Sequence, residues 1–114
     1  MEQEIYKVMT KKEWQDAKQN GVFKGSEVDV SDGFIHFSTA AQVQETVGKH
    51  FAGQQDLLLI RFGAEQFGDV LKWEISRGGD MFPHLYGDLP VEAANSVWQL
   101  PLKSDGQHQF PSQY

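Results

Sequence analysis

The stretch Gly33-Phe34-Ile35-His36-Phe37-Ser38-Thr39-Ala40-Ala41-Gln42, residues 33–42, decides the fold of this chain. The turn signal Asp32-Gly33 opens a short apolar strand over residues 34–37. That strand leads directly into Thr39-Ala40-Ala41-Gln42, a capping-box pattern typical of a helix start. Val43, Val47 and Phe51 then recur at the spacing of one helix face. The segment therefore predicts a strand that passes straight into a helix.

A second helix is predicted nearer the beginning of the sequence. Residues 5–9 are expected to form a strand, and Thr10-Lys11-Lys12-Glu13 is a capping box that starts a helix at Lys11. Trp14 and Ala17 face inward as an i, i+3 pair. The helix is expected to end near Asn20-Gly21, since glycine accepts the left-handed cap conformation. Residues 22–31 are interpreted as a loop.

Strands dominate the second half of the chain. Residues 57–62 form a β-compatible run that is apolar except for Arg61, typical of a central strand. Residues 71–75 alternate, with Lys72 and Glu74 on the polar face. Asp88-Leu89-Pro90 is expected to open a short helical turn before a last strand at 97–102. The polar tail from Lys103 is expected to be loose until Phe110-Pro111. Two helices for about five strands are too few for a parallel crossover fold, so we predict an α+β domain with mixed, largely antiparallel sheets and two main helices.

The composition indicates a single globular domain over residues 1–114. The chain is 39% hydrophobic and 23% charged, and it contains no cysteine, which excludes disulfides and thiolate chemistry. Its formal net charge is −6 with no basic run, which disfavours binding to duplex nucleic acid. The first residues lack a signal-peptide pattern, and the longest apolar run, Leu57 to Ile60, is far too short to span a membrane. We therefore expect a cytoplasmic protein without a membrane partner.

The start of the helix that follows residues 34–37 is a candidate anion site. His36 and Ser38 lie two residues apart in the strand, so both are expected on the same side, next to the free backbone amides of the helix start. Ser38 and Thr39 would hold a phosphate or carboxylate while His36 orients it. The alternative is that Ser38 or Thr39 is only a helix cap and that His36 is a half-buried strand residue.

A loop over residues 77–87 concentrates polar and aromatic groups that are typical of binding walls. Arg77 is the candidate clamp for phosphate or carboxylate, with His84 and Tyr86 beside it. In the alternative interpretation this is a surface loop with His84 in solvent. Glu74 is either a solvated strand residue or a carboxylate that stabilises positive charge or acts as a base.

The sequence favours no metal site. The four histidines show no short ligand spacing, although a site made of His36, Glu74 and His84 is geometrically open. His50 and His108 are expected to face solvent. Motifs for a serine nucleophile, a phosphate-binding loop and a dinucleotide-binding loop are all absent from the sequence.

Four strings carry a resemblance to a known family: IYKVMTKKEWQDAKQNGVFKGS, DGFIHFSTAAQVQET, LLLI and LKWEISRGGDMFPHLYGDL. In these strings and their order, the chain resembles the bacterial domain of unknown function 952 family over nearly its whole length. Members of that family are similar to the ADP-ribosyltransferase fold, in which two small sheets form an NAD-binding cleft. The resemblance therefore implies that fold for this chain.

One step further away, the chain is similar to the RNA 2′-phosphotransferases, which share that fold and use NAD to remove a phosphate. This resemblance implies His36 and Glu74 as catalytic residues, with NAD as a substrate and not a bound cofactor. Its implied substrate-binding residues are Lys7, Ser38, Thr39, Arg77, His84 and Tyr86. Lys7 stands where those enzymes have histidine or arginine, and Glu74 is not part of a Glu-x-Glu pair.

Three function classes follow from these patterns. The first is an NAD- or nucleotide-binding transferase of the ADP-ribosyl-transfer type. The second is a non-catalytic domain that binds a nucleotide or a small phosphorylated ligand, and the third is a scaffold that binds a protein partner through exposed aromatic residues. Fold similarity alone does not choose among them.

Overall fold

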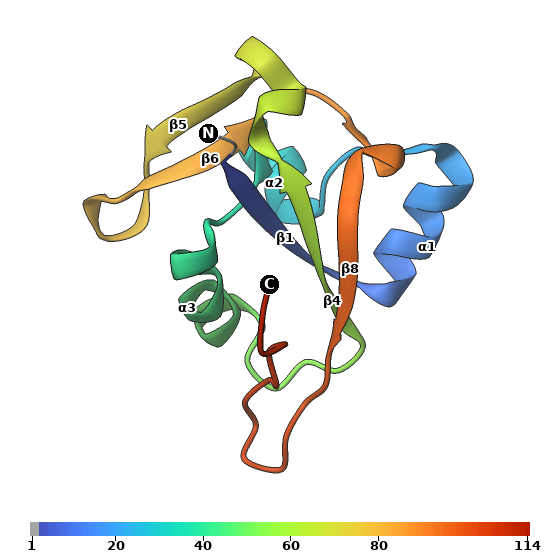
Figure 1. Cartoon of the computed structure of the whole chain (residues 1–114), viewed down its shortest axis with the longest axis vertical. Helices are drawn as coiled ribbons and strands as arrows, with labels where there is room; N and C mark the ends of the chain where they lie inside the picture. Colours follow the sequence, from blue (N-terminus) through green and yellow to red (C-terminus); the bar gives the residue numbers. More distant parts are fainter. Residues whose placement is uncertain (1–2) are drawn as a thin grey trace.

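The sheets are antiparallel throughout the part of the chain that the structure describes. This computed structural model describes residues 3–114, except for the side chain of Arg77. One three-stranded sheet has the order β1-β4-β8 and another has the order β3-β6-β5 (Figure 1). Their strands are β1 (Glu4–Thr10), β3 (Ile35–His36), β4 (Leu57–Gly63), β5 (Leu71–Ile75), β6 (Met81–Leu85) and β8 (Ala94–Leu100). A separate pair is formed by β2 (Val22–Phe23) and β7 (Leu89–Pro90).

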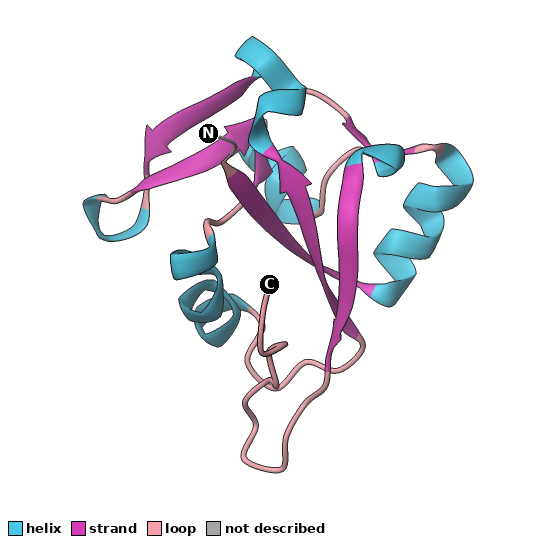
Figure 2. Ribbon diagram, viewed as in Figure 1, coloured by secondary structure: helices cyan, strands magenta, loops and turns pink. Residues whose placement is uncertain are grey.

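Figure 2 draws α-helices and 3-10 helices alike in cyan. Within residues 3–114, three α-helices accompany these strands. They are α1 (Lys11–Asn20), α2 (Glu27–Asp32) and α3 (Ala40–His50), and short 3-10 helices occupy η1 (Ala64–Val70), η2 (Arg77–Gly79) and η3 (Val91–Ala93). The α+β class is therefore confirmed. The prediction of two main helices and of a loop at residues 22–31 is corrected, since that segment contains β2 and most of α2.

The capping boxes explain where the helices begin. The hydroxyl of Thr10 accepts from the Glu13 amide at 3.0 Å, and the Thr10 amide donates to Glu13 Oε1 at 2.9 Å. Ser26 and Asp29 form the equivalent box at the start of α2. A box that satisfies two free amide groups lets a helix as short as α2 begin at a fixed residue.

The core lies on both faces of the β1-β4-β8 sheet. Successive residues of β1 alternate between two buried clusters, with Ile5 and Met9 in one and Tyr6 and Val8 in the other. Val43 and Val47 of α3 pack on the second cluster, and Trp14 of α1 packs on the first. Each fully buried aliphatic side chain contributes roughly 1.5–3 kcal/mol relative to an exposed one. Residues 3–114 contain no helix of the length and apolar character that a membrane crossing needs.

The segment after β3 joins the two three-stranded sheets. The Tyr6 amide donates to the Ser38 carbonyl at 2.7 Å, and the Ser38 amide donates to the Tyr6 carbonyl at 2.9 Å. On the other side, the Phe37 amide donates to the Pro83 carbonyl of β6 at 3.0 Å. The short predicted strand therefore lies between both sheets, with His36 opposite His84 of β6.

Several details of the second half differ from the sequence prediction, among them the predicted loop at 77–87, which contains the strand β6. The last strand spans Ala94–Leu100, while residues 97–102 were expected. The helical turn that residues 88–90 were expected to open is present as η3, which begins directly after Pro90, although Leu89–Pro90 themselves form the strand β7. The tail between Lys103 and Phe110 is not loose, because Leu102 bridges to His108 and the Lys103 amide donates to the Gln107 carbonyl at 2.7 Å.

Candidate functional site

A buried carboxylate, Asp29, organises the centre of the site. Its side chain is 2% exposed and accepts hydrogen bonds from Lys7 Nζ at 2.9 and 3.2 Å. Asp29 Oδ1 also lies 2.6 Å from His36 Nδ1 and accepts from the His36 amide at 3.1 Å. Asp29 Oδ2 accepts from the Ser26 amide at 2.9 Å. One carboxylate therefore fixes the first strand, the start of α2 and the histidine of β3 together.

The local chain is built to admit this carboxylate. Gly25 has φ 115°, and a Cβ there would lie 2.8 Å from the Asp29 Cβ. Only glycine fits such a close approach with this backbone angle. Lys7 Nζ completes its coordination with the His36 carbonyl at 2.8 Å.

Charge pairing decides the ionisation of this buried centre. Burial by itself would raise the pKa of the Asp29 carboxyl, but the His36 hydrogen bond and the Lys7 charge hold that pKa well below its usual range. Burial lowers the pKa of the Lys7 ammonium, and the Asp29 carboxylate opposes that change. Lys7 is 7% exposed and bound to Asp29, so its charge is neutralised inside the protein.

His36 is held at both ring nitrogens. Nδ1 contacts Asp29, and Nε2 lies 2.9 Å from Asp32 Oδ2 at the end of α2. The imidazole is 32% exposed, so one side reaches the surface. A histidine anchored in this way presents a fixed ring face and not a free nitrogen.

An aromatic cluster forms the surface next to His36. The ring of Phe34 stacks on His84, with 4.1 Å between centroids and 24° between planes. The same ring lies 4.7 Å from His36 and 5.2 Å from Tyr86. We call Phe34, His36, Glu74, His84 and Tyr86 the Phe34 cluster. The β3-β6 register produces it, because His36 and His84 are direct cross-strand partners.

Glu74 is the carboxylate of the Phe34 cluster. Its Oε1 accepts from the Tyr86 hydroxyl at 2.7 Å and lies 2.8 Å from His84 Nδ1. These hydrogen bonds, that from His84 first, lower the pKa of the Glu74 carboxyl, while the bond to Glu74 raises the pKa of Tyr86. The Glu74 side chain is 39% exposed. The cluster therefore presents an ionised carboxylate beside three rings at the surface.

The structure brings four of the eight predicted site residues into this cluster: His36, Glu74, His84 and Tyr86. Lys7 lies behind it, in contact with the backbone of His36. The side chain of Arg77 lies outside the described residues, and only its place in η2 is known.

Ser38 and Thr39 are engaged elsewhere. The Ser38 hydroxyl is buried and lies 2.9 Å from the Thr46 hydroxyl of α3. Thr39 is the N-cap of α3, and its amide donates to Gln42 Oε1 at 3.0 Å. The His36 ring turns to α2, away from these two residues. Ligand binding by these two residues stays a prediction.

Sequence reasoning missed Asp29, Asp32 and Phe34. The signal for Asp29 was the Ser26–Asp29 spacing, which is the spacing of a capping box. His50 faces solvent as expected, but the same expectation for His108 is wrong. His108 is 8% exposed, and its Nε2 lies 2.7 Å from the Gln54 carbonyl.

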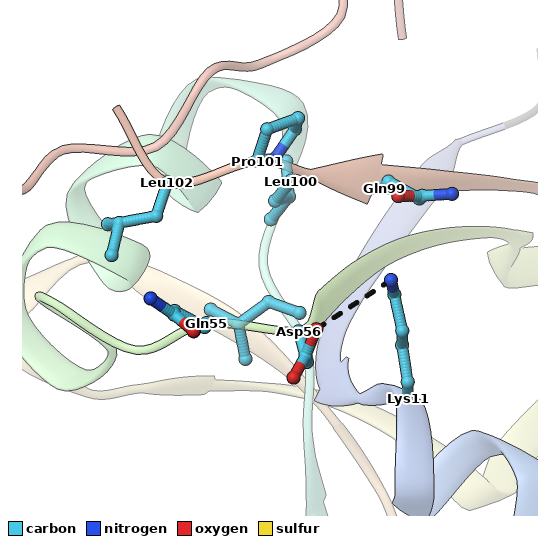
Figure 3. A pocket seen from close by; sticks show the side chains of 8 residues that line it. Lys11, Gln55, Asp56, Gln99, Leu100, Pro101 and Leu102 are labelled. Carbon is cyan, nitrogen blue, oxygen red and sulfur yellow. Dashed lines mark ion pairs between the residues drawn. The ribbon is translucent and has the colours of Figure 1, made fainter. Parts of the chain in front are cut away.

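Two hollows of about 230 and 210 Å³ lie away from the Phe34 cluster. Figure 3 shows the first, where the ion pair of Lys11 and Asp56 stands beside Leu100 and Leu102. The second lies between α1 and the chain around Phe23. Among the residues described, no group of three histidine or acidic side chains is placed to hold a metal ion.

Comparison with known proteins finds a matching family model and similar solved structures. The model of the family described as protein of unknown function (DUF952) matches residues 8–97. The crystal structure of protein CC0527 from Caulobacter crescentus is 49% identical, covers 93% of both chains and has a TM-score of 0.90. The solution structure of CC0527 has a TM-score of 0.84 over 93% of this chain and 91% of that one. No curated protein gives a significant match.

Proposed function

This chain belongs to the DUF952 family, and we propose from its own residues that it binds a nicotinamide nucleotide such as NAD and transfers its ADP-ribosyl group. The observation that carries the proposal is Glu74, a half-exposed carboxylate that His84 and Tyr86 keep ionised beside aromatic rings. We propose with it that the fold is ADP-ribosyltransferase-like. Two three-stranded sheets that meet beside the Phe34 cluster support that assignment.

Transfer of an ADP-ribosyl group is favoured by a fixed negative charge near the ribose. When the glycosidic C–N bond of a nicotinamide nucleotide breaks, nicotinamide leaves with the bonding electrons and positive charge develops on the ribose. A preorganised carboxylate stabilises that charge without reorganising during the reaction. Glu74 meets this requirement because its pKa is lowered and its Oε1 is already fixed by two partners. An acceptor nucleophile then bonds to the ribose carbon.

The rings supply the binding surface. Tyr86 is 37% exposed, and Phe34 is partly exposed beside it, so a nicotinamide or adenine ring can stack there. His36 lies in the same cluster and is held by Asp29 and Asp32, which makes it a fixed wall for the ligand.

A second candidate is a domain that binds a nucleotide without reacting with it. Both nitrogens of His36 and the hydroxyl of Ser38 are engaged inside the protein, which leaves them poorly placed for proton transfer. This observation favours ligand binding over a reaction that needs an acid or base from those two residues.

The test begins with thermal unfolding in the presence of NAD, ADP-ribose or nicotinamide. A ligand at 100 times its dissociation constant stabilises by about 2.7 kcal/mol, which raises the melting temperature of a domain this size by several degrees. A shift with NAD supports nucleotide binding. No shift with any of the three overturns the transferase proposal.

Nicotinamide release separates the candidates. We expect release by the wild type, loss of at least about 100-fold in Glu74→Gln, and unchanged release in Glu92→Gln, which alters an exposed glutamate of η3. Binding of NAD without release supports the second candidate. Equal release by the Glu74→Gln variant contradicts the role of Glu74.

A further inference from the structure

The strand β5 is an open edge of its sheet. Among residues 3–114, the order β3-β6-β5 pairs β5 on one side only, and β5 lies outermost in Figure 1. The Pro83 carbonyl of β6 accepts from Phe37, so Pro83 directs its backbone groups toward the β3 side. Trp73 is the direct partner of Pro83 in β5. Since the Pro83 carbonyl points away from β5, Trp73 and Pro83 are a cross-strand pair without hydrogen bonds between them. The N–H and C=O groups of Trp73 therefore point away from β6, toward the open edge.

The same alternation turns the backbone of Ile75 outward. The neighbouring residue Ser76 donates its amide inward to Asp80, as the alternation requires. Around this edge three apolar side chains are exposed: Ile75 by 73%, Met81 by 47% and Trp73 by 37%. A strand edge with free backbone groups and exposed apolar side chains is a template for pairing with another chain.

The residues of β5 are complementary to their own reverse. The strand reads Leu71-Lys72-Trp73-Glu74-Ile75. If a second β5 runs antiparallel about a two-fold axis at Trp73, Leu71 faces Ile75 and Lys72 faces Glu74, twice each. Apolar residues then oppose apolar residues and cations oppose anions, which are the pairings that stabilise antiparallel strands. A two-fold dimer requires a surface that is complementary to itself.

We propose that two copies of this chain pair through β5 and form one continuous six-stranded sheet. The centre is a pair of Trp73 residues whose outward backbone groups bond to each other. Lys72 and Glu74 have inward backbone groups, so they meet in the closer type of cross-strand pair. Glu74 lies in the Phe34 cluster, so the second copy adds its own Lys72 to each candidate site. This inference does not depend on the proposed reaction.

Other edges of the described sheets lack this complementarity. The open edge of the first sheet is β8, which reads Ala94-Asn95-Ser96-Val97-Trp98-Gln99-Leu100 and has no charged residue. β3 is two residues long, and β1 is continued by the bridge between Tyr6 and Ser38. Charge complementarity therefore selects β5.

Sedimentation equilibrium over a range of protein concentrations up to about 1 mM tests the proposal. High concentrations are needed because small interfaces give weak dimers. We expect a wild-type monomer–dimer equilibrium. Lys72→Glu replaces two attractive pairs by two repulsive ones and weakens the dimer at least about tenfold. Glu74→Lys does the same. Lys103→Glu, an equal charge change in an exposed residue outside the edge, leaves the equilibrium unchanged.

The decisive arm mixes the two charge-reversed variants. Each variant is expected to be monomeric alone. An equimolar mixture restores both attractive pairs, so it is expected to form a heterodimer at the protein concentrations at which the wild type dimerises. Amide hydrogen exchange gives an independent measurement on the wild type, since Trp73 and Ile75 amides are expected to gain protection as concentration rises. A wild type that stays monomeric, a Lys72→Glu variant that dimerises like the wild type, or folded variants that fail to associate on mixing would overturn the proposal.

Discussion

Replacing Asp29 by asparagine should be one of the most destabilising single changes in this domain. The carboxylate accepts from Lys7, His36 and Ser26, and its side chain is 2% exposed. An amide offers one acceptor oxygen, so its NH2 group would face donors. The Lys7 ammonium would lose its anionic partner, although the uncharged His36 carbonyl would still accept a hydrogen bond from it. Breaking a buried ion pair from one side costs about 3–5 kcal/mol, a large part of the roughly 5–15 kcal/mol that stabilises a typical domain.

The companion change Lys7→Met should cost less. Asp29 would still accept from the Ser26 amide, the His36 amide and the His36 ring. We expect a loss of about 1–3 kcal/mol, the cost of an incompletely satisfied buried polar group. The double variant should lose less than the sum of the two single losses, by about 0.5–3 kcal/mol, because contacting residues are coupled.

Urea unfolding followed by circular dichroism measures all four proteins of this cycle. The free energies follow from the transition midpoints, provided that the m-values agree. If the single losses add to the double loss within about 0.5 kcal/mol, the two residues act independently, and the role of Asp29 as the organiser of the site is refuted.

The same carboxylate sets a pH dependence. Its folded-state pKa is lower than the value of an unfolded aspartate, about 3.9. The stabilisation is therefore complete above that value and is lost as the pH falls below it. The difference in stability between wild type and Asp29→Asn should narrow on acidification below about pH 4. A difference that stays constant in that range contradicts the assigned shift.

Two further predictions concern Glu74 and Gly25. Tyr86→Phe removes a hydrogen-bond donor from Glu74, so the pKa of Glu74 should rise in a carboxyl NMR titration. Glu74→Gln should return the raised pKa of Tyr86 toward its ordinary value in an ultraviolet titration. Unchanged pKa values would exclude the hydrogen bond between Tyr86 and Glu74. Gly25→Ala should lower the melting temperature more than Gly21→Ala, because only the Cβ at position 25 meets an atom, the Asp29 Cβ at 2.8 Å. Equal losses of melting temperature would show that the strained backbone angle, and not the contact with the Asp29 Cβ, determines the effect of both substitutions.

Local patterns predicted the parts of the fold whose cause is local. The capping box of Thr10 and Glu13 depends on residues three apart, and the structure confirms both it and the helix that follows. Residues 34–37 were predicted as a strand because their apolar run ends at a helix start. Their pairing with β6 is long-range, and periodicity alone does not specify it.

The centre of the site was not predictable from such patterns. Lys7 and Asp29 are 22 residues apart, and nothing near either residue indicates the other. The helix that carries Asp29 has six residues, too few to show a helical period. His84 and Glu74 were found as candidates by residue type, but their contact through Phe34 and Tyr86 follows from strand register.

The bridge between Tyr6 and Ser38 also bears on the order of events during synthesis. The segment that carries His36 is flanked by β1, made first, and by β6, made about fifty residues later. Contacts of such long sequence separation close late because they carry the largest loop entropy. On the ribosome, α1 can form as soon as it emerges, whereas the Phe34 cluster has to wait until residue 86 has left the exit tunnel. In a chain truncated before β6, the segment that carries His36 lacks its β6 partner, and its unpaired edge is therefore expected to be exposed to chaperones and proteases.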